Sequence, residues 1–460
     1  MNAALRQAIQ ELLADLEKTF PYASALWMRT EGTRASLDRK NQSLDLQDPN
    51  TGIVFSIYTG AAVEEFASSE GNSTGLVQSV KSWANDLPRP GAGVKPLPVQ
   101  ERAQSQTFIT PVQRDPATTP VKEKLQTLRN MQEHAQGLDS RIVNAQIAYS
   151  DSHGQRIFLR PTYTLDQTIV RITFYLLLMV SDNQQMQYTF TSHGGTGGLE
   201  IIAMSDEELD QLKEDALRLL QAEQIPPGNY DVVTDNSTAG TIAHECFGHG
   251  TELDLFPKKR AKSAQFIGER VAAPGVNMFD DPGVAGAYGT YFFDDEGMLA
   301  QPTQILENGI LIHPLSDLYS TLALPAYRRT ANGRRESFAR KAYARMSNTF
   351  FGTGEQTPSD LLESLEDGIY LRRAMSGVED PLGWGVQVTV HIGEEYKHGK
   401  PTGRIFSPVG ITGYVPELLG SISAIGNDLE LSSGHCGKGH KEMVPVSTGG
   451  PHLRLRARLG

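Results

Sequence analysis

Apolar and polar residues repeat with two different periods in the first 88 residues of the chain. Residues 1–20 place apolar side chains at helical spacing among acidic ones, which predicts an amphipathic helix. Short runs of strand-like composition follow, separated by Gly, Asn and Asp, and they predict antiparallel strands. GLVQSVKSWA, residues 75–84, returns to helical spacing. We therefore expect residues 1–88 to form an N-terminal α/β domain.

A second α/β region follows a stretch that interrupts regular structure. LPRPGAGVKPLP, residues 87–98, is rich in Pro and Gly and predicts a linker. A helix is expected over residues 119–137, followed by strand segments that end with the apolar run ITFYLLLMV. Ser205 is positioned to cap a further helix with acids in its first turn. We expect these elements to form a central α/β domain over residues 103–224.

The remaining residues, 225–460, are dominated by short runs separated by glycine, which predict antiparallel strands. The segment NSTAGTIAHECFGHGTELD predicts a helix, for which Asn236 or Ser237 is the expected cap. The predicted fold class is therefore α+β. An N-terminal α/β region in two parts precedes a mainly antiparallel β C-terminal domain that carries this helix.

Charge and hydropathy exclude several classes of protein. With 39% hydrophobic and 21% charged residues, the composition is that of a folded chain. The formal net charge of −12 argues against a general nucleic-acid binder. The N-terminus lacks a signal-peptide pattern, and no apolar run approaches the roughly 20 residues that span a bilayer. We expect a cytoplasmic protein that binds neither nucleic acid nor membrane.

Basic residues gather in one segment in spite of this acidic balance. Residues 324–345 hold seven Arg or Lys and a single acidic residue. Such a segment either contacts an anion, for example the carboxylate end of a peptide, or forms a solvated basic loop. The pattern leaves both interpretations open.

The strongest chemical signal lies in HECFGHG. Glu245 directly follows His244, and His249 lies one residue further away than in the common H-E-x-x-H zinc motif. On a regular α-helix these histidines would lie roughly 140° apart, which is unsuited to sharing one metal ion. The neighbouring glycines permit two solutions, a local π-type turn or a helix that ends near the second histidine.

A catalytic zinc ion usually has three protein ligands and an open position, so a third ligand is needed. The chain contains two cysteines, Cys246 and Cys436. Cys246 lies on the same element as the histidines, whereas Cys436 lies in a distant Gly-rich loop that can approach the metal from an open direction. We therefore predict Cys436 as the thiolate ligand, with Cys246 as the competing candidate.

Several segments together resemble the TldD/PmbA family of zinc metalloproteases, and specifically the TldD-like branch that retains the H-E-x-x-x-H motif. HECFGHGTELD resembles the family's metal segment. ANGRRESFARKAYARMSNTFF is similar to its Gly-Arg-Arg-Glu-Ser block, and HCGKGHKEMVPVSTGGPHLRL to its terminal Cys-Gly-Lys loop and last strand. The chain departs from the family after Cys-Gly-Lys, where GHKE replaces the usual Asp-Gly-Gln.

The resemblance implies that His244, His249 and Cys436 hold zinc and that Glu245 acts as the general base. The physical interpretation of the motif gives Glu245 the same role, because a glutamate beside a ligand histidine can reach the water on the metal. Asp254 is expected either to orient a ligand histidine or to lie at the surface near the helix end.

Three further residues, Arg334, Arg335 and Asn348, fall in blocks that resemble the family. They are expected either to contact substrate or, as the favoured interpretation, to support the fold. The resemblance also implies a dimer, formed by two copies of the chain or by this chain with a PmbA-like partner that lacks the metal motif.

The function predicted on this basis is zinc-dependent hydrolysis of extended or unfolded peptides, such as leader peptides and unstructured small proteins. Two alternatives remain. In the first alternative, the chain is a regulatory or binding subunit with a structural zinc. In the second, it is a metallohydrolase that acts on a non-peptide amide.

Overall fold

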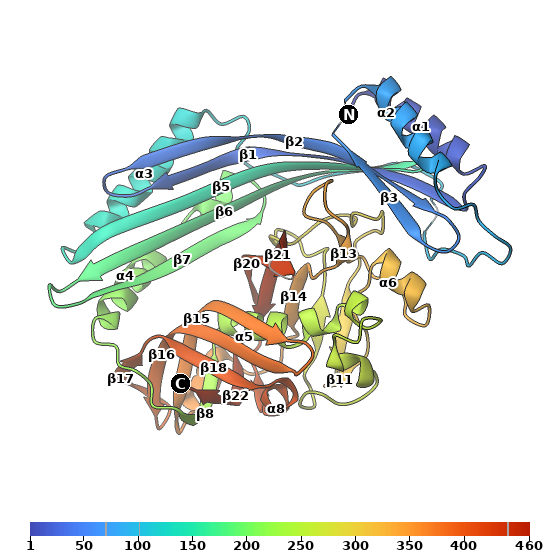
Figure 1. The fold of residues 1–460 in the computed structure, drawn as a ribbon. Helices are drawn as coiled ribbons and strands as arrows, with labels where there is room; N and C mark the ends of the chain where they lie inside the picture. The colour runs from blue at the N-terminus through green and yellow to red at the C-terminus, as the bar shows by residue number, and fades with distance from the viewer. Residues whose placement is uncertain (70, 101, 439–440) are drawn as a thin grey trace.

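A long, curved and mainly antiparallel sheet dominates the N-terminal half of the protein (Figure 1). The computed structural model describes residues 1–69, 71–100, 102–438 and 441–460. The strands follow the order β3-β2-β1-β5-β6-β4, and β7 pairs with β6. Their bounds are β1 Tyr22–Leu37, β2 Gln42–Tyr58, β3 Val63–Ser68, β4 Gln106–Ile109, β5 Ile142–Leu159, β6 Thr164–Ser181 and β7 Met186–Thr196.

One face of this sheet packs against helices, and the other faces the C-terminal half. Because side chains alternate along a strand, Ile147 and Ile157 of β5 lie on the helix-covered face, whereas Phe158 packs against Phe293 of the C-terminal half. Among the described residues, no helix is long and apolar enough to cross a bilayer. The helices are α1 Ala3–Leu16, α2 Ser73–Asn85, α3 Val121–Gly137 and α4 Asp206–Leu219.

Local sequence signals predict these helices well. The helix expected over 119–137 is α3, and Ser205 caps α4 by accepting a hydrogen bond from the backbone N–H of Glu208. The predicted linker separates α2 from β4. However, β1 pairs with β5 from Ala25–Leu159 to Leu37–Ile147, so the predicted 1–88 and 103–224 parts share one sheet.

The C-terminal half contains two larger sheets (Figure 1). The first sheet has the strand order β11-β10-β9-β14-β21-β20. The second has the order β15-β8-β22-β18-β16-β17. Strands β15 and β16 of this second sheet also pair with each other, so the sheet is closed. The predicted α+β class is confirmed. The strand bounds are β8 Gly228–Thr234, β9 Met278–Asp280, β10 Thr303–Glu307, β11 Ile310–Leu311, β14 Asn348–Phe351, β15 Asp367–Asp380, β16 Gly385–Lys397, β17 Lys400–Phe406, β18 Val409–Tyr414, β20 Glu430–Lys438, β21 Lys441–Gly450 and β22 Leu453–Leu459.

Smaller elements complete this half. Strands β12 and β13 pair with each other, and β19 pairs with β22. Helix α7 is capped by Thr357 through a capping box. The bounds are β12 Gly333–Arg334, β13 Tyr343–Ala344, β19 Ala424–Ile425, α6 Leu318–Ala323, α7 Pro358–Glu363 and α8 Val415–Gly420.

Helix α5, Asn236–Phe247, lies between the two C-terminal sheets and shares their hydrophobic core. It approaches β21 closely at Gly240, where a Cβ atom would lie 2.5 Å from the backbone nitrogen of Gly449. No side chain fits at this crossing, because real Cβ atoms do not approach backbone atoms so closely. Glycine at position 240 is therefore what lets the helix lie against the strand.

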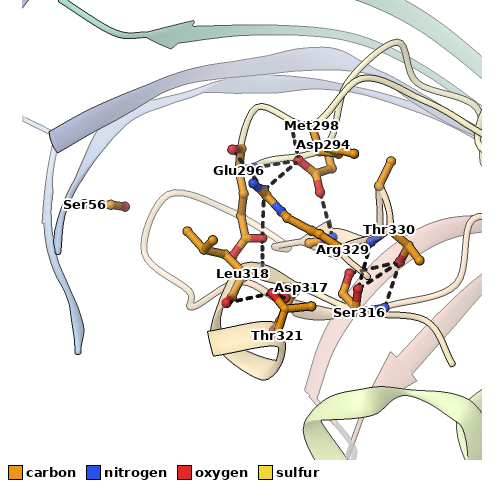
Figure 2. Close-up of polar contacts among 12 residues, drawn as sticks. Ser56, Asp294, Glu296, Met298, Ser316, Asp317, Leu318, Thr321, Arg329 and Thr330 are labelled. Carbon is orange, nitrogen blue, oxygen red and sulfur yellow. Dashed lines mark hydrogen bonds and ion pairs between the residues drawn. The ribbon is translucent and has the colours of Figure 1, made fainter. Parts of the chain in front are cut away.

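A buried cluster of carboxylates lies beside α6, around the guanidinium of Arg329 (Figure 2). The carboxylate of Glu296 lies 3.2 Å from Arg329 and accepts a hydrogen bond of 2.7 Å from the backbone N–H of Leu318. Asp294 lies 3.7 Å from the same guanidinium, and Asp317 caps α6. One cation therefore lies among two buried acids, Asp294 and Asp317, and the partly buried Glu296.

Burial raises the pKa of Glu296 to about 8; the charge of Arg329 opposes this rise, and Asp317 and Asp294 add to it. Burial also raises the pKa of Asp294 to about 6. Since the ordinary value for Glu is 4.5, the folded protein binds a proton on Glu296 more tightly than the unfolded chain does. This group therefore stabilises the fold fully below pH 4.5, and the contribution is lost as the pH rises through about 8.

Replacing Glu296 with Gln should remove this pH dependence. The free energy of unfolding should fall between pH 5 and pH 8 in wild type. In Glu296→Gln we expect this fall to be smaller by about 1.4 kcal/mol or more, which corresponds to one pKa unit. Chemical denaturation at each pH measures it. The exposed Glu366→Gln serves as the control. Parallel curves for wild type and Glu296→Gln would contradict the assignment.

Candidate metal centre

The helix that carries His244 begins one or two residues earlier than the expected caps, Asn236 and Ser237, imply. Asp235 caps α5, and its side chain accepts a hydrogen bond of 2.8 Å from the backbone N–H of Thr238. Neither Asn236 nor Ser237 is the cap. Asn236 instead donates to the backbone carbonyls of Asp428 and Gly450, which join the start of α5 to the strands beside it.

The helix ends between the two histidines. Its last residue is Phe247, Gly248 follows as the C-cap, and a single 3-10 turn runs over His249–Thr251. The second of the two predicted solutions is therefore the one observed. Because the chain leaves the α-helical path at Gly248, His249 is no longer held 140° away from His244 as on an ideal helix of roughly 100° per residue.

Three metal-binding side chains meet at this point. One potential ligand atom from each of His244, His249 and Cys436 lies within 4.8 Å of the other two. The Sγ atom of Cys436 is 3.1 Å from Nε2 of His249, and the two imidazole rings are nearly perpendicular at 86°. Two imidazoles and a thiolate are ligand types that bind zinc, and three protein ligands would leave one coordination position open.

Cys436 lies on a strand and not in the predicted loop. It belongs to β20 and is paired with Val444 of β21. Arg345, which is 1% exposed, donates to the backbone carbonyls of Cys436 and Glu442 and so fastens both strands of the hairpin. The thiol is thus held by backbone pairing. Gly439 and His440, in the segment where the sequence departs from the family, lie outside the described residues.

Glu252 orients one of the ligand histidines. Its carboxylate lies 3.3 Å from Nδ1 of His249, which leaves Nε2 on the side of Cys436. Burial would raise the pKa of Glu252, but Lys438, His249 and Arg345 outweigh it and hold the value at about 2. The sequence signal for this residue is its spacing, since it lies one helical turn after His249.

Asp254, which was expected either to orient a histidine or to lie at the surface, does neither. It is 3% exposed and pairs with Lys438 at 2.6 Å and with Lys258 at 3.2 Å. Lys438 also lies 3.0 Å from Glu252. This lysine therefore connects the strand that carries Cys436 to the segment that follows His249.

The electrostatic surroundings favour a thiolate at Cys436. Burial by itself would raise the pKa of the thiol, but the rings of His244 and His249 outweigh it and hold the pKa well below its usual range. Cys246 has the opposite environment. It is fully buried in the core, and burial raises its pKa well above the ordinary value. The structure thus brings Cys436, and not Cys246, to the histidines.

A cleft of about 700 Å³ opens beside these residues and is lined by His244 and Glu245. Glu245 is 9% exposed. It lies against Gly377 of β15, where a Cβ atom would come within 2.4 Å of Glu245 Cγ. A side chain at position 377 would therefore displace the glutamate, so this glycine keeps the space that the carboxylate occupies.

Four arginines of the basic segment, Arg329, Arg334, Arg335 and Arg345, are buried, whereas Arg328 and Arg340 are exposed, so only part of the segment is a solvated loop. Arg334 donates to the backbone carbonyls of Met346 and Pro445 at 2.5 and 2.8 Å. Arg335 pairs with Glu65 of the N-terminal sheet at 2.7 Å. Both arginines tie distant segments together.

Asn348 is also fully buried, and it bonds to the backbone of Asp281 and Gly289. Among the described residues that line the cleft, none of Arg334, Arg335 and Asn348 is found. Their contacts are those of residues that support the fold, and a role in substrate binding stays a prediction.

Comparison with known proteins identifies relatives of this arrangement. The family model described as the PmbA/TldA metallopeptidase C-terminal domain matches residues 227–458. A metalloprotease of Methanothermobacter thermautotrophicus is 33% identical over 75% of each chain. A zinc metalloprotease TldD homolog of Saccharolobus solfataricus is 27% identical over 55% of this chain and 56% of its own.

Solved structures share the whole fold. A Thermotoga maritima protein superposes with a TM-score of 0.79 at 18% identity and covers 99% of both chains. TldE from Thermococcus kodakarensis gives a TM-score of 0.74 at 13% identity, with 98% of this chain and 99% of its own covered. At these identities the likeness concerns the fold alone.

The ligand set predicts unequal effects of the two cysteines. Cys436→Ala should lower the affinity for metal by more than about 100-fold, because losing a ligand should cost at least as much as losing one of its hydrogen-bonded partners. Cys246→Ala, the matched control, should retain the metal. Elemental analysis of dialysed protein measures the metal bound per chain. Equal metal content in the two variants would refute the assigned ligands.

Proposed function

Because the chain belongs to the TldD/PmbA family of metallopeptidases, we propose that it is a zinc-dependent peptidase that cleaves extended peptides. One observation carries this proposal. Cys436 reaches His244 and His249 from a distant part of the sequence, and Glu245 lines the same cleft as His244.

The donor set fits zinc. Zinc takes imidazole nitrogen and thiolate sulfur together, and with three protein ligands it keeps a position open for water or substrate. When bound, zinc lowers the pKa of water and polarises a carbonyl group. The buried carboxylate of Glu252 would hold His249 in the tautomer that presents Nε2, and the low pKa of Cys436 would keep its sulfur as the thiolate.

Glu245 is the group that moves the proton. Its carboxylate would accept a proton from the attacking water and then donate that proton to the nitrogen of the leaving amine. Its neighbour in sequence, His244, is a ligand, which keeps the carboxylate close to the reacting atoms. The contact with Gly377 leaves the carboxylate room in the cleft.

The walls of the cleft favour an extended chain as the substrate. Residues of β7, β15 and β20 line it. Among the described residues, β20 and β7 each pair with one neighbour, and β15 has no partner on its β8 side beyond Leu371. Unpaired strand edges bind extended peptides through backbone hydrogen bonds, which every residue type can make.

The two alternatives receive less support. A structural zinc would normally have four protein ligands, and the described residues gather three here, with Cys246 in the core. Hydrolysis of a small non-peptide amide would not need the strand edges that line the cleft.

Glu245→Gln is expected to keep the metal and lose hydrolysis. The amide preserves the shape of the side chain but cannot accept the proton, so turnover should fall on the order of a hundredfold or more. Steady-state cleavage of a fluorogenic peptide measures turnover, and elemental analysis measures the metal. Near wild-type turnover in the variant would place the base on another residue.

The extended-substrate proposal predicts cleavage that depends on the fold of the substrate. A disordered peptide should be cut rapidly, whereas the same sequence inside a stable domain should resist, because local unfolding costs several kcal/mol. Quantitative mass spectrometry of both digests measures the rates. Methylation of one backbone nitrogen in the peptide, away from the cleaved bond, provides the sharper control.

The methylated peptide keeps its side chains and loses one backbone donor, so it should be cut more slowly if an edge strand binds it. Equal cleavage of the free and folded sequences would refute the proposal. Cleavage of neither, by metal-loaded enzyme, would favour a structural metal.

A further inference from the structure

A second, much smaller cavity lies between the N-terminal sheet and the C-terminal half. Its volume is about 40 Å³, and among the described residues it shares no lining residue with the metal cleft. The wall includes Arg156 and Arg171 from the sheet, and Arg334 and Arg335 from the C-terminal half. Guanidinium groups from both halves of the protein thus meet around one small space.

The carboxylates of this wall already have cationic partners. Asp295 pairs with Arg156 at 2.8 Å. Asp294 lies 3.7 Å from Arg329, and Glu336 lies 3.8 Å from Arg340. Arg335, the second arginine of the wall that pairs with a carboxylate, lies 2.7 Å from Glu65.

Arg171 and Arg334 differ from the other two arginines of the wall, because their guanidinium groups donate to backbone carbonyls and not to carboxylates. Arg171 is 7% exposed and donates through Nε to Tyr288 and through Nη2 to Thr290, at 2.8 and 2.6 Å. Its Nη1 group donates to no described residue. Within the described part of the chain, neither Arg171 nor Arg334 has a carboxylate at salt-bridge distance.

The two charges also act on each other. Burial, together with the neighbouring Arg156 and Arg334, lowers the pKa of Arg171 to about 9, and Tyr288 and Asp295 oppose this fall. Burial lowers the pKa of Arg334 as well. A buried cation without a counter-ion is costly, so a pair of them facing one cavity calls for negative charge there.

We propose that this cavity is a binding site for one small monovalent anion, such as chloride, held between the guanidinium groups of Arg171 and Arg334. The size favours such an ion. A water molecule needs roughly 10–15 Å³ of this kind of space, so the cavity holds two or three water-sized particles and is too small for a large organic anion.

The site would join the two halves of the molecule. Arg171 holds the segment at Tyr288 and Thr290, and Arg334 holds Pro445, which pairs with His435 on the hairpin that carries Cys436. An anion between these arginines would offset their repulsion and stabilise both attachments. This site is independent of the proposed peptidase activity.

Crystals of the full chain soaked in bromide test the site directly. Bromide is a heavier analogue of chloride, and anomalous diffraction locates it. We expect an anomalous peak between the guanidinium groups of Arg171 and Arg334. Absence of a peak there at saturating bromide would overturn the proposal. This result is obtained on wild-type protein, so it does not depend on the folding of any variant.

Thermal unfolding in solution tests whether the bound anion stabilises the protein. Raising chloride at constant ionic strength, with gluconate as the bulky replacement, should raise the Tm of wild type by about 2 °C or more. Arg171→Gln should lose this chloride-specific shift, and the exposed control Arg141→Gln should retain it.

The same chloride shift in Arg171→Gln and in wild type would contradict binding at this cavity. A carboxylate from a bound peptide is the other possible source of the charge. In that case peptide, and not chloride, would raise the Tm, and the free-ion proposal would be wrong.

Discussion

The close crossing of α5 and β21 determines where every ligand of the metal centre lies. At Gly240 and Gly449 the helix and the strand touch through their backbones, with no side chain between them. His244 follows one turn later on α5, and Cys436 lies on β20, the next strand in the sheet. A side chain at position 240 would push the helix away from the sheet, whereas one at position 449 would meet Glu430 and Leu431 of β20. The distance between imidazole and thiolate therefore depends on the absence of a side chain at Gly240.

Local signals in the sequence predicted much of the fold. The helices α1, α3 and α4 follow from apolar spacing and, for α4, from a Ser cap. The meeting of His244, His249 and Cys436 was also predictable, since the motif and one distant cysteine suggested it, while metal binding by them stays a prediction. What local signals did not provide was pairing between distant strands. The continuous sheet across the linker depends on β1 meeting β5, and hydrophobic alternation in each strand does not say which partner it has.

Local signals also did not show which charged residues are buried. Sequence shows that residues 324–345 are basic, but it does not show whether a guanidinium will be buried. Arg334, Arg335 and Arg345 are buried because each donates hydrogen bonds to backbone carbonyls or to a carboxylate of a remote segment. Likewise Glu252 and Asp254 are both acids close to His249, and only the path of the 3-10 turn decides which one touches the histidine.

The wide separation of the ligands along the chain has a consequence for the protein during its own synthesis. Cys436 lies 187 residues after His249. At a translation rate of about 5–20 residues per second, the two histidines leave the ribosome some 10 to 40 seconds before the thiolate does. β20, on which Cys436 is held, pairs only with the later strand β21 among the described residues. A nascent chain therefore carries only two of the three candidate ligands, and the group is completed only when its last strands have been made.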